Sequence, residues 1–288
     1  MEIGWSSRDT ATRMYDSLAF LQVLPNNKSF EFVGRSSSIK LLRSFANKRS
    51  NTNGFLSSNF FASRRYWVRF QMAVKTAVFV SGGGRSLENL LRYCDKGALE
   101  ETQIVTVVSS KNGTKALEIA KNWSVPAQVV SPRNYPSNTE FSQALVDVCA
   151  SYGVSLIVLA GWLHFFHIPP SFQGRVINIH PSLIPSFCGK GYYGMNVHKA
   201  VLDFGVKITG CTVHFADNEY DHGPIILQKA VDVLETDTVD TLSRRVFEAE
   251  KVALPEAIRL FSKGLLKLEG RRVKILKEAL KETCVGDK

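Results

Sequence analysis

The chain has 288 residues, enough for one large domain or two small ones. Hydrophobic residues make up 44% of it, which supports a buried core, and no stretch of 18 apolar residues predicts a membrane span. The net charge of +10 falls mostly in residues 1–72, which hold 11 Lys/Arg and 4 Asp/Glu, whereas residues 73–288 hold 25 and 22. We therefore expect no membrane association and no nucleic-acid surface in the body of the chain.

Residues 1–72 have the composition of an organelle transit peptide. From Phe32 to Met72 there is no Asp or Glu, and eight Lys or Arg residues are scattered among many serines. A Ser-rich, Arg-rich and acid-poor segment without a single apolar core is typical of transit peptides rather than secretory signals. We expect a disordered targeting segment, read by an import machinery and cleaved between about Ser63 and Val74. A merely basic tail is the alternative, and a second start at Met72 would give a cytosolic form.

Short apolar runs alternate with amphipathic stretches through residues 73–288. Strands are expected at 75–80, 104–108, 127–130, 155–160, 175–180, 208–215 and 225–233, with a last edge strand in 271–276. Helices are expected from the glycine loop to about residue 92, and at 114–123, 139–152, 193–204 and 239–260. This alternation predicts a single Rossmann-like α/β domain over 73–288, with a mostly parallel sheet and helices on both faces.

A glycine-rich loop follows the first expected strand. Its sequence, Ser81-Gly-Gly-Gly-Arg85-Ser86, leads directly into an amphipathic helix. Glycines at this point let backbone N–H groups approach an anion at the helix N-terminus. The loop matches neither a Walker motif nor G-x-G-x-x-G, so a tight strand-to-helix turn remains the alternative to a phosphate site.

The expected strand at 175–180 ends by presenting an amide and an imidazole. Asn178 and His180 are two residues apart, so their side chains point to the same face, and Pro181 ends the strand. An acidic loop, Asp217 to Asp221, follows the next strand. A carboxylate beside an imidazole raises its pKa and orients it. Asn, His and Asp without a Ser or Cys nucleophile indicate proton transfer and oxyanion stabilisation.

The five cysteines form no C-x-x-C pair and no cluster with histidine at zinc spacing. We expect reduced thiols and no metal site.

These motifs together resemble a known family. Asn178-Ile-His-Pro-Ser-Leu-Ile-Pro185, Gly210-x-Thr-Val-His214 and Asp221-His-Gly-Pro-Ile-Ile226 are similar to the formyltransferases that use 10-formyltetrahydrofolate. The resemblance runs from about Lys75 to Leu266, and the stretches 187–194 and 197–200 are similar to plant members. It implies formyl transfer from 10-formyltetrahydrofolate to the amino group of glycinamide ribonucleotide in purine biosynthesis, without a metal. It also favours the chloroplast, with the mitochondrion as an alternative.

The resemblance implies roles for particular residues. Asn178, His180 and Asp221 would be catalytic. The phosphate of the nucleotide would be held by Gly84, Arg85 and Ser86, and its ribose by Glu250. The folate would be bound by Leu163, His164, Phe165, Phe166, Asn178, Asp217, Asn218, Glu219 and Tyr220. The family usually has Gly-Ser-Asn at the phosphate loop, so Arg85 and Ser86 depart from its pattern and could indicate a changed acceptor.

The expected mechanism has two stabilising groups for the tetrahedral oxyanion, a protonated His180 and the Asn178 amide. Asp221 is expected to keep His180 charged by raising its pKa.

Three other functions compete with this prediction. A formyltetrahydrofolate deformylase carries the same Asn/His/Asp set, but its preceding ligand-binding module is not suggested by the basic, serine-rich residues 1–72. A methionyl-tRNA formyltransferase would need a tRNA-binding barrel, for which the residues after Leu266 leave little room. A non-catalytic folate-binding protein would not need Asn178, His180 and Asp221 together. The oligomeric state is not predicted.

Overall fold

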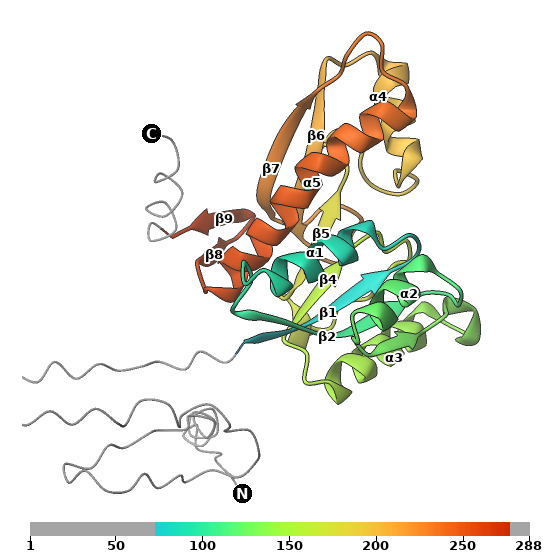
Figure 1. Ribbon diagram of the computed structural model, residues 1–288, viewed down its shortest axis with the longest axis vertical. Helices are drawn as coiled ribbons and strands as arrows, with labels where there is room; N and C mark the ends of the chain where they lie inside the picture. The colour runs from blue at the N-terminus through green and yellow to red at the C-terminus, as the bar shows by residue number, and fades with distance from the viewer. Residues whose placement is uncertain (1–72, 277–288) are drawn as a thin grey trace, which may run out of the picture. The chain divides into compact units, whose positions relative to one another are not determined.

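The computed structural model describes residues 73–276, so the predictions for residues 1–72 and for Cys284 lie outside the described residues. The described part contains one nine-stranded sheet and five α-helices (Figure 1). None of the helices in the described part combines the length and the apolar character that a membrane-spanning helix needs.

The strands and helices follow the predicted order closely. The strands are β1 (Val74–Val80), β2 (Thr102–Ser109), β3 (Ala127–Val129), β4 (Leu156–Leu159), β5 (Val176–His180), β6 (Ile208–Phe215), β7 (Ile225–Asp232), β8 (Leu266–Glu269) and β9 (Arg272–Ile275). The helices are α1 (Arg85–Asp95), α2 (Lys115–Asn122), α3 (Asn138–Ser151), α4 (Met195–Phe204) and α5 (Val239–Ser262), with 3-10 turns at Pro132–Asn134 and Pro170–Phe172. Every predicted element is confirmed to within a few residues, whereas β8 was not predicted.

The strand order is β3-β2-β1-β4-β5-β6-β7-β9-β8. Five of the eight neighbouring pairs are parallel, which confirms the mostly parallel sheet. The sheet changes from parallel to antiparallel at β5 and β6. The prediction of an edge strand in 271–276 was wrong in one respect. β9 is inside the sheet, because it pairs with both β7 and β8, and β8 takes the edge.

Each face of the central strands packs against its own hydrophobic core. Val78 and Val80 of β1 join the first core with residues of α1, α2, α4 and α5, whereas Ala77 and Phe79 join the second core with residues of α3. This alternation follows from the two-residue period of a strand buried on both faces. On β5, Ile177 and Ile179 belong to the first core, so the opposite face carries Asn178 and His180.

The longest helix begins at a well-defined cap. Thr238 Oγ1 accepts a hydrogen bond from the Thr241 amide at 3.2 Å, and the Thr238 amide donates to Thr241 Oγ1 at 2.9 Å. This reciprocal capping box satisfies two backbone donors that the first turn leaves free. It therefore defines the start of α5, the helix that carries Glu250.

The carboxyl ends of the parallel strands β1, β4 and β5 meet at one edge of the sheet. There the amide of Ser81, after β1, donates to the Gly161 carbonyl, after β4, at 3.1 Å. Ser81 Oγ also accepts from the Leu163 amide at 3.0 Å. The glycine loop and the stretch 161–166 are thus joined, at the edge where open α/β sheets bind ligands.

The backbones of the antiparallel strands β6 and β7 pack closely together at Gly210. A Cβ at this position would lie 1.9 Å from the Lys229 carbonyl oxygen and 2.9 Å from a Leu183 side-chain carbon. We expect Gly210→Ala to lower the free energy of unfolding by about 3 kcal/mol, because the backbone of β7 must shift. Urea unfolding measures this loss. A Cβ at Gly83 meets nothing within 4 Å, so Gly83→Ala is the control. Equal unfolding midpoints for the two variants would contradict the packing described.

Candidate active site

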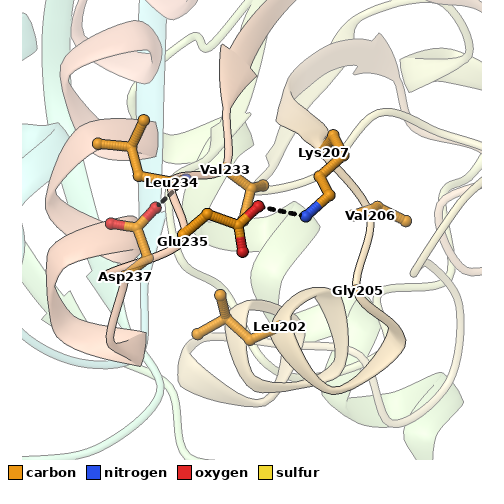
Figure 2. A pocket seen from close by; sticks show the side chains of 8 residues that line it. All are labelled: Leu202, Gly205, Val206, Lys207, Val233, Leu234, Glu235 and Asp237. Atoms are coloured by element: carbon orange, nitrogen blue, oxygen red, sulfur yellow. Dashed lines mark hydrogen bonds and ion pairs between the residues drawn. The ribbon is translucent and has the colours of Figure 1, made fainter.

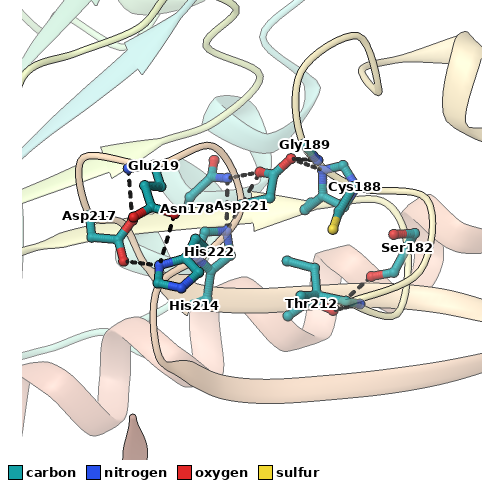
Figure 3. A network of polar contacts seen from close by, with 12 residues as sticks. Asn178, Ser182, Cys188, Gly189, Thr212, His214, Asp217, Glu219, Asp221 and His222 are labelled. Atoms are coloured by element: carbon teal, nitrogen blue, oxygen red, sulfur yellow. Dashed lines mark hydrogen bonds and ion pairs between the residues drawn. The ribbon is translucent and has the colours of Figure 1, made fainter. Parts of the chain in front are cut away.

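The structure brings Asn178, His180 and Asp221 together at the end of β5, and Figure 3 shows Asn178 beside Asp221. Asn178 Nδ2 donates to Asp221 Oδ1 at 3.3 Å, and His180 Nδ1 lies 3.4 Å from Asp221 Oδ2. The His180 side chain is buried, with 5% of its surface exposed, and that of Asp221 is 11% exposed. An amide, an imidazole and a carboxylate therefore share one nearly dry cluster.

Asp221 reaches this position through an unusual backbone conformation. Its φ is +52°, which is uncommon for a residue other than glycine. The loop around it is held at both ends. The Asn218 side chain exchanges two hydrogen bonds with the backbone of Ile168, at 2.8 and 3.2 Å, and a Cβ on Gly223 would lie 1.8 Å from the Phe215 carbonyl oxygen. Strain of this kind persists only where the surroundings impose it.

The net pKa shift of His180 has the opposite direction to the predicted one. Burial lowers the pKa of His180, and the opposing effects of Asp221 and of the Phe187 carbonyl do not overcome it. Asp221 does raise the pKa of this imidazole, as predicted, but burial lowers it by more, so the net shift is opposite to the expectation that His180 is kept charged. His180 is thus biased towards the neutral form.

Asp221 shows the opposite balance. Burial alone would raise the pKa of Asp221, but nearby His214 and His180 and the Gly189 amide together hold it below its usual value. The Gly189 N–H donates to Asp221 Oδ2 at 2.9 Å. Asp221 is therefore ionised at neutral pH.

Two contacts to this cluster come from residues to which the sequence analysis gave no role. The Phe187 carbonyl accepts from His180 Nε2 at 2.9 Å, and Gly189 bonds to Asp221 as above. Both residues have positive φ, and both act through backbone atoms. Only the density of glycines in residues 189–194 signalled an irregular segment here.

His214 also belongs to the cluster. Its Nδ1 lies 2.9 Å from the Phe215 carbonyl and must donate, so its Nε2 accepts from Asn178 Nδ2 at 3.1 Å. The Asn178 amide group consequently donates to both His214 and Asp221. This arrangement fixes the orientation of the amide.

The glycine loop has the geometry of an anion site. Gly84 precedes α1 with φ +71°, and no side chain caps the helix. A Cβ on Gly84 would lie 2.8 Å from Ala116 Cα, so the close packing of α1 on α2 requires glycine. Arg85 is exposed and its guanidinium lies 4.3 Å above the Phe247 ring, while Ser86 is half-buried. Free N–H groups and a guanidinium at a helix N-terminus suit a phosphate.

Glu250 lies on the same helix as Phe247, three residues further on. Burial raises the pKa of Glu250 to about 7, against the opposing charge of Arg85. The residue is half-buried. A carboxyl with a strongly raised pKa of this kind is typical of a functional site.

The stretch 163–166 borders the same edge of the sheet. Leu163 is exposed, His164 packs edge-on against Trp162 and Phe141, and Phe165 packs edge-on against Tyr220 at 5.3 Å. Phe166 points into the second core instead, so only its backbone can face a ligand. The Phe165–Tyr220 contact joins this stretch to the acidic loop.

The acidic loop 217–222 uses much of its polarity internally. Asp217 accepts from the Glu219 amide at 3.0 Å and from His222 Nδ1 at 2.8 Å (Figure 3). Asn218 is committed to Ile168. Glu219 and Tyr220 are exposed and remain available to a ligand.

A separate hollow of about 210 Å³ lies away from this cluster, between α4, β7 and the start of α5 (Figure 2). Lys207 and Glu235 form an ion pair across it. It contains none of the predicted site residues. Within the described part of the chain, no group of His, Cys, Asp or Glu is placed to hold a metal ion.

His198 of α4 is a buried histidine whose pKa is affected by Arg85 and His180 of the site. Its side chain is 4% exposed, and its Nδ1 has no partner among residues 73–276. Burial and the charges of Arg85 and His180 lower the pKa of His198 to about 4. The unfolded chain takes up this proton near pH 6.5, so acidification between 6.5 and 4 favours unfolding.

We expect the free energy of unfolding to fall less for His198→Gln than for the wild type when the pH is lowered from 7.5 to 5. The two decreases, measured by urea unfolding at both pH values, should differ by about 2 kcal/mol. A wild type and variant with the same pH dependence would show that His198 titrates normally in the folded protein.

Comparisons with known proteins agree with this geometry. The formyl transferase family profile matches residues 74–258. The chain is 44% identical over 197 residues to the trifunctional purine biosynthetic protein adenosine-3 of Gallus gallus, and 38% identical over 187 residues to the chloroplastic phosphoribosylglycinamide formyltransferase of Arabidopsis thaliana. A glycinamide ribonucleotide transformylase from Symbiobacterium toebii superposes with a TM-score of 0.67 at 42% identity, covering 71% of this chain and 95% of that one.

The extent of these matches differs. They cover 68% and 64% of this chain for the Gallus gallus and Arabidopsis thaliana proteins, but 19% and 64% of those proteins' own lengths. The family match spans both the glycine loop and the Asn178–Asp221 cluster, which are the two parts of the candidate site. The chain belongs to the formyl transferase family.

Proposed function

We propose that this protein transfers the formyl group of 10-formyltetrahydrofolate to the amino group of glycinamide ribonucleotide, a step of de novo purine biosynthesis. The observation that carries the proposal is the convergence of Asn178 and His180 on Asp221, at the sheet edge that also carries an anion-type glycine loop. The names of the Arabidopsis thaliana and Symbiobacterium toebii proteins support it.

The nucleotide would lie across the glycine loop and α5. We assign its phosphate to the N–H groups at Gly84 and Ser86 and to the Arg85 guanidinium, which suits planar contacts with phosphate oxygens. Arg85 thus takes a direct role at a position where the family usually has serine. We assign the ribose hydroxyls to Glu250, since a carboxylate can accept two hydrogen bonds from them.

The folate would lie between residues 163–166 and the acidic loop. Leu163, His164 and Phe165 supply an apolar border, and the Phe166 backbone supplies polar atoms. Glu219 and Tyr220 are the exposed members of the loop, while Asp217 and Asn218 shape it. No step of the proposed reaction uses a metal.

The reaction needs one proton to move. The substrate amine attacks the formyl carbon, and the carbonyl oxygen becomes an oxyanion. A neutral His180 can take the proton that the amine nitrogen loses, and the resulting imidazolium is stabilised by Asp221. The imidazolium then returns the proton to the folate nitrogen as the carbon–nitrogen bond to folate breaks. The lowered pKa of His180 thus suits it to begin as a base.

Two hydrogen bonds of the described structure must be exchanged for this chemistry. His180 Nε2 donates to the Phe187 carbonyl, which the substrate amine would replace. The hydrogen of the neutral imidazole must then move to Nδ1, where it donates to Asp221, so that Nε2 can accept the proton. Asn178 donates to His214 at 3.1 Å and to Asp221 at 3.3 Å. We assign the longer bond as the one that gives way, so that Asn178 can donate to the oxyanion while His214 keeps the amide oriented.

We further propose that residues 1–72 direct the protein to a plastid. The Arabidopsis thaliana and Vigna unguiculata relatives are named chloroplastic. The acid-poor, serine-rich composition of this segment suits an import machinery. The formyltransferase domain would then comprise residues 73–288.

The proposal is tested with purified protein, 10-formyltetrahydrofolate and glycinamide ribonucleotide. We expect deformylated folate to appear only with the nucleotide present, in equal amount to formylglycinamide ribonucleotide. Formate release at the same rate without nucleotide would mean a hydrolase. Folate binding without turnover under either condition would mean a binding protein.

Substitution of the central residues tests the mechanism. We expect His180→Asn and Asp221→Asn each to lower kcat by about 10²- to 10⁴-fold, because proton transfer loses its base or its stabilising partner. Steady-state kinetics measures the loss, and circular dichroism confirms folding. His167 is exposed and has no assigned role, so His167→Asn is the matched control. A His180 variant with the turnover of this control would rule out the assignment.

Glu250 should make nucleotide binding sensitive to pH. Its pKa of about 7 means that the carboxylate is largely lost between pH 8 and pH 6. Because protonation of Glu250 removes the carboxylate that would bind the ribose, we expect the wild-type KM for glycinamide ribonucleotide to rise about tenfold between pH 8 and pH 6.

The Glu250→Gln variant should show a smaller rise in this KM. Glu248→Gln is the control, because Glu248 is an exposed residue of the same helix that pairs with Lys251. Identical pH profiles for all three proteins would exclude Glu250 from nucleotide binding.

A further inference from the structure

We propose that Arg271, in the C-terminal hairpin, positions the acidic loop of the active site through His222. This inference rests on the proposed function. The β8–β9 hairpin lies beyond residue 258, where the family match ends, and the sequence analysis gave neither Arg271 nor His222 a role.

The contact between the hairpin and the loop is direct. Arg271 Nη1 donates to His222 Nε2 at 2.6 Å, and Arg271 Nη2 donates to the His222 carbonyl oxygen at 2.7 Å. One guanidinium thus holds both the side chain and the backbone of a single residue. Because two parallel donors fix an orientation as well as a distance, this contact is more specific than a single ion pair.

The contact continues into the loop. Since Arg271 donates to Nε2, the neutral imidazole carries its hydrogen on Nδ1, which donates to Asp217 Oδ2 at 2.8 Å. The other oxygen of Asp217 accepts from the Glu219 amide at 3.0 Å. Arg271, His222 and Asp217 therefore form a chain of hydrogen bonds that begins in the hairpin and ends at the backbone of the loop (Figure 3 shows the portion from His222 to Glu219).

These hydrogen bonds also constrain Asp221, which stabilises the imidazolium in the proposed mechanism. His222 follows Asp221 directly, so fixing the His222 carbonyl fixes the peptide group next to Asp221. Asp221 has a φ of +52°, which must be imposed by its neighbours. Asn218 anchors the start of the loop to Ile168, and Arg271 anchors its end. The hairpin is itself held by the pairing of Ile225 with Arg272.

The role of Arg271 is positioning rather than catalytic, since it contacts none of Asn178, His180 or Asp221. Loss of its anchor should loosen the loop that borders the folate. We expect Arg271→Ala to raise the KM for 10-formyltetrahydrofolate and the Kd for tetrahydrofolate by about tenfold, as two charge-assisted hydrogen bonds are lost. The KM for glycinamide ribonucleotide should stay within about twofold, because the glycine loop and α5 are not involved.

Arg272→Ala is the matched control, because Arg272 is the adjacent exposed arginine of the same hairpin. Arg271→Lys should give an intermediate folate KM, since an ammonium cannot reach both acceptors in the geometry of the fork. In the His222→Ala background, Arg271→Ala should have a smaller further effect than in the wild type, because only the bond to the backbone carbonyl of position 222 remains to be lost. A general loss of folding would instead lower turnover without separating the two KM values.

Hydrogen–deuterium exchange tests the anchor without relying on turnover. The Glu219 amide should exchange faster in Arg271→Ala than in the wild type or in Arg272→Ala. If exchange and folate affinity in Arg271→Ala match the Arg272→Ala control, the positioning role is refuted, even if the wild type transfers formyl groups. If the wild type transfers no formyl groups while the Glu219 amide still exchanges faster in Arg271→Ala than in the wild type, the proposed function fails and the positioning role of Arg271 is supported.

Discussion

The Asp221 carboxylate is the point on which the candidate site depends. It lies within reach of the Asn178 amide, the Gly189 N–H and the imidazoles of His180 and His214. A carboxylate that is 11% exposed would be costly without such partners. The same contacts lower its pKa despite burial, so the site holds a fixed negative charge. The left-handed backbone conformation of Asp221 is unfavourable, and the contacts that anchor the loop hold the residue in it.

Two opposing effects act on the pKa of His180. Burial favours its neutral form, whereas Asp221 and the Phe187 carbonyl favour the charged form, and burial is the larger effect. An imidazole poised in this way can accept a proton during attack and is stabilised by Asp221 once it has done so. The fold therefore supplies both a dry environment and a counter-charge, from a strand end and a loop that are 41 positions apart in sequence.

The sequence predicted most of the fold, because period-two apolar runs and amphipathic helices are local signals. The pairing of Asn178 with His180 followed from strand geometry in the same way, and the glycine loop from its position before α1. The hairpin strand β8 was missed because Leu266–Glu269 is short and half exposed. The unpredicted contacts at the site, from Phe187, Gly189 and Arg271, involve backbone atoms or partners distant in sequence. No local pattern encodes them, and none could reveal that burial outweighs the charge of Asp221.

Asp221 is electrostatically coupled to His180 within a buried cluster. The most direct test is to follow the His180 imidazole by NMR through a pH titration, in the wild type and in Asp221→Asn. We expect the pKa of His180 to be below 6.5 in the wild type and lower still in the variant, because burial remains while the counter-charge is lost. An unchanged or higher pKa in a folded Asp221→Asn variant would contradict it.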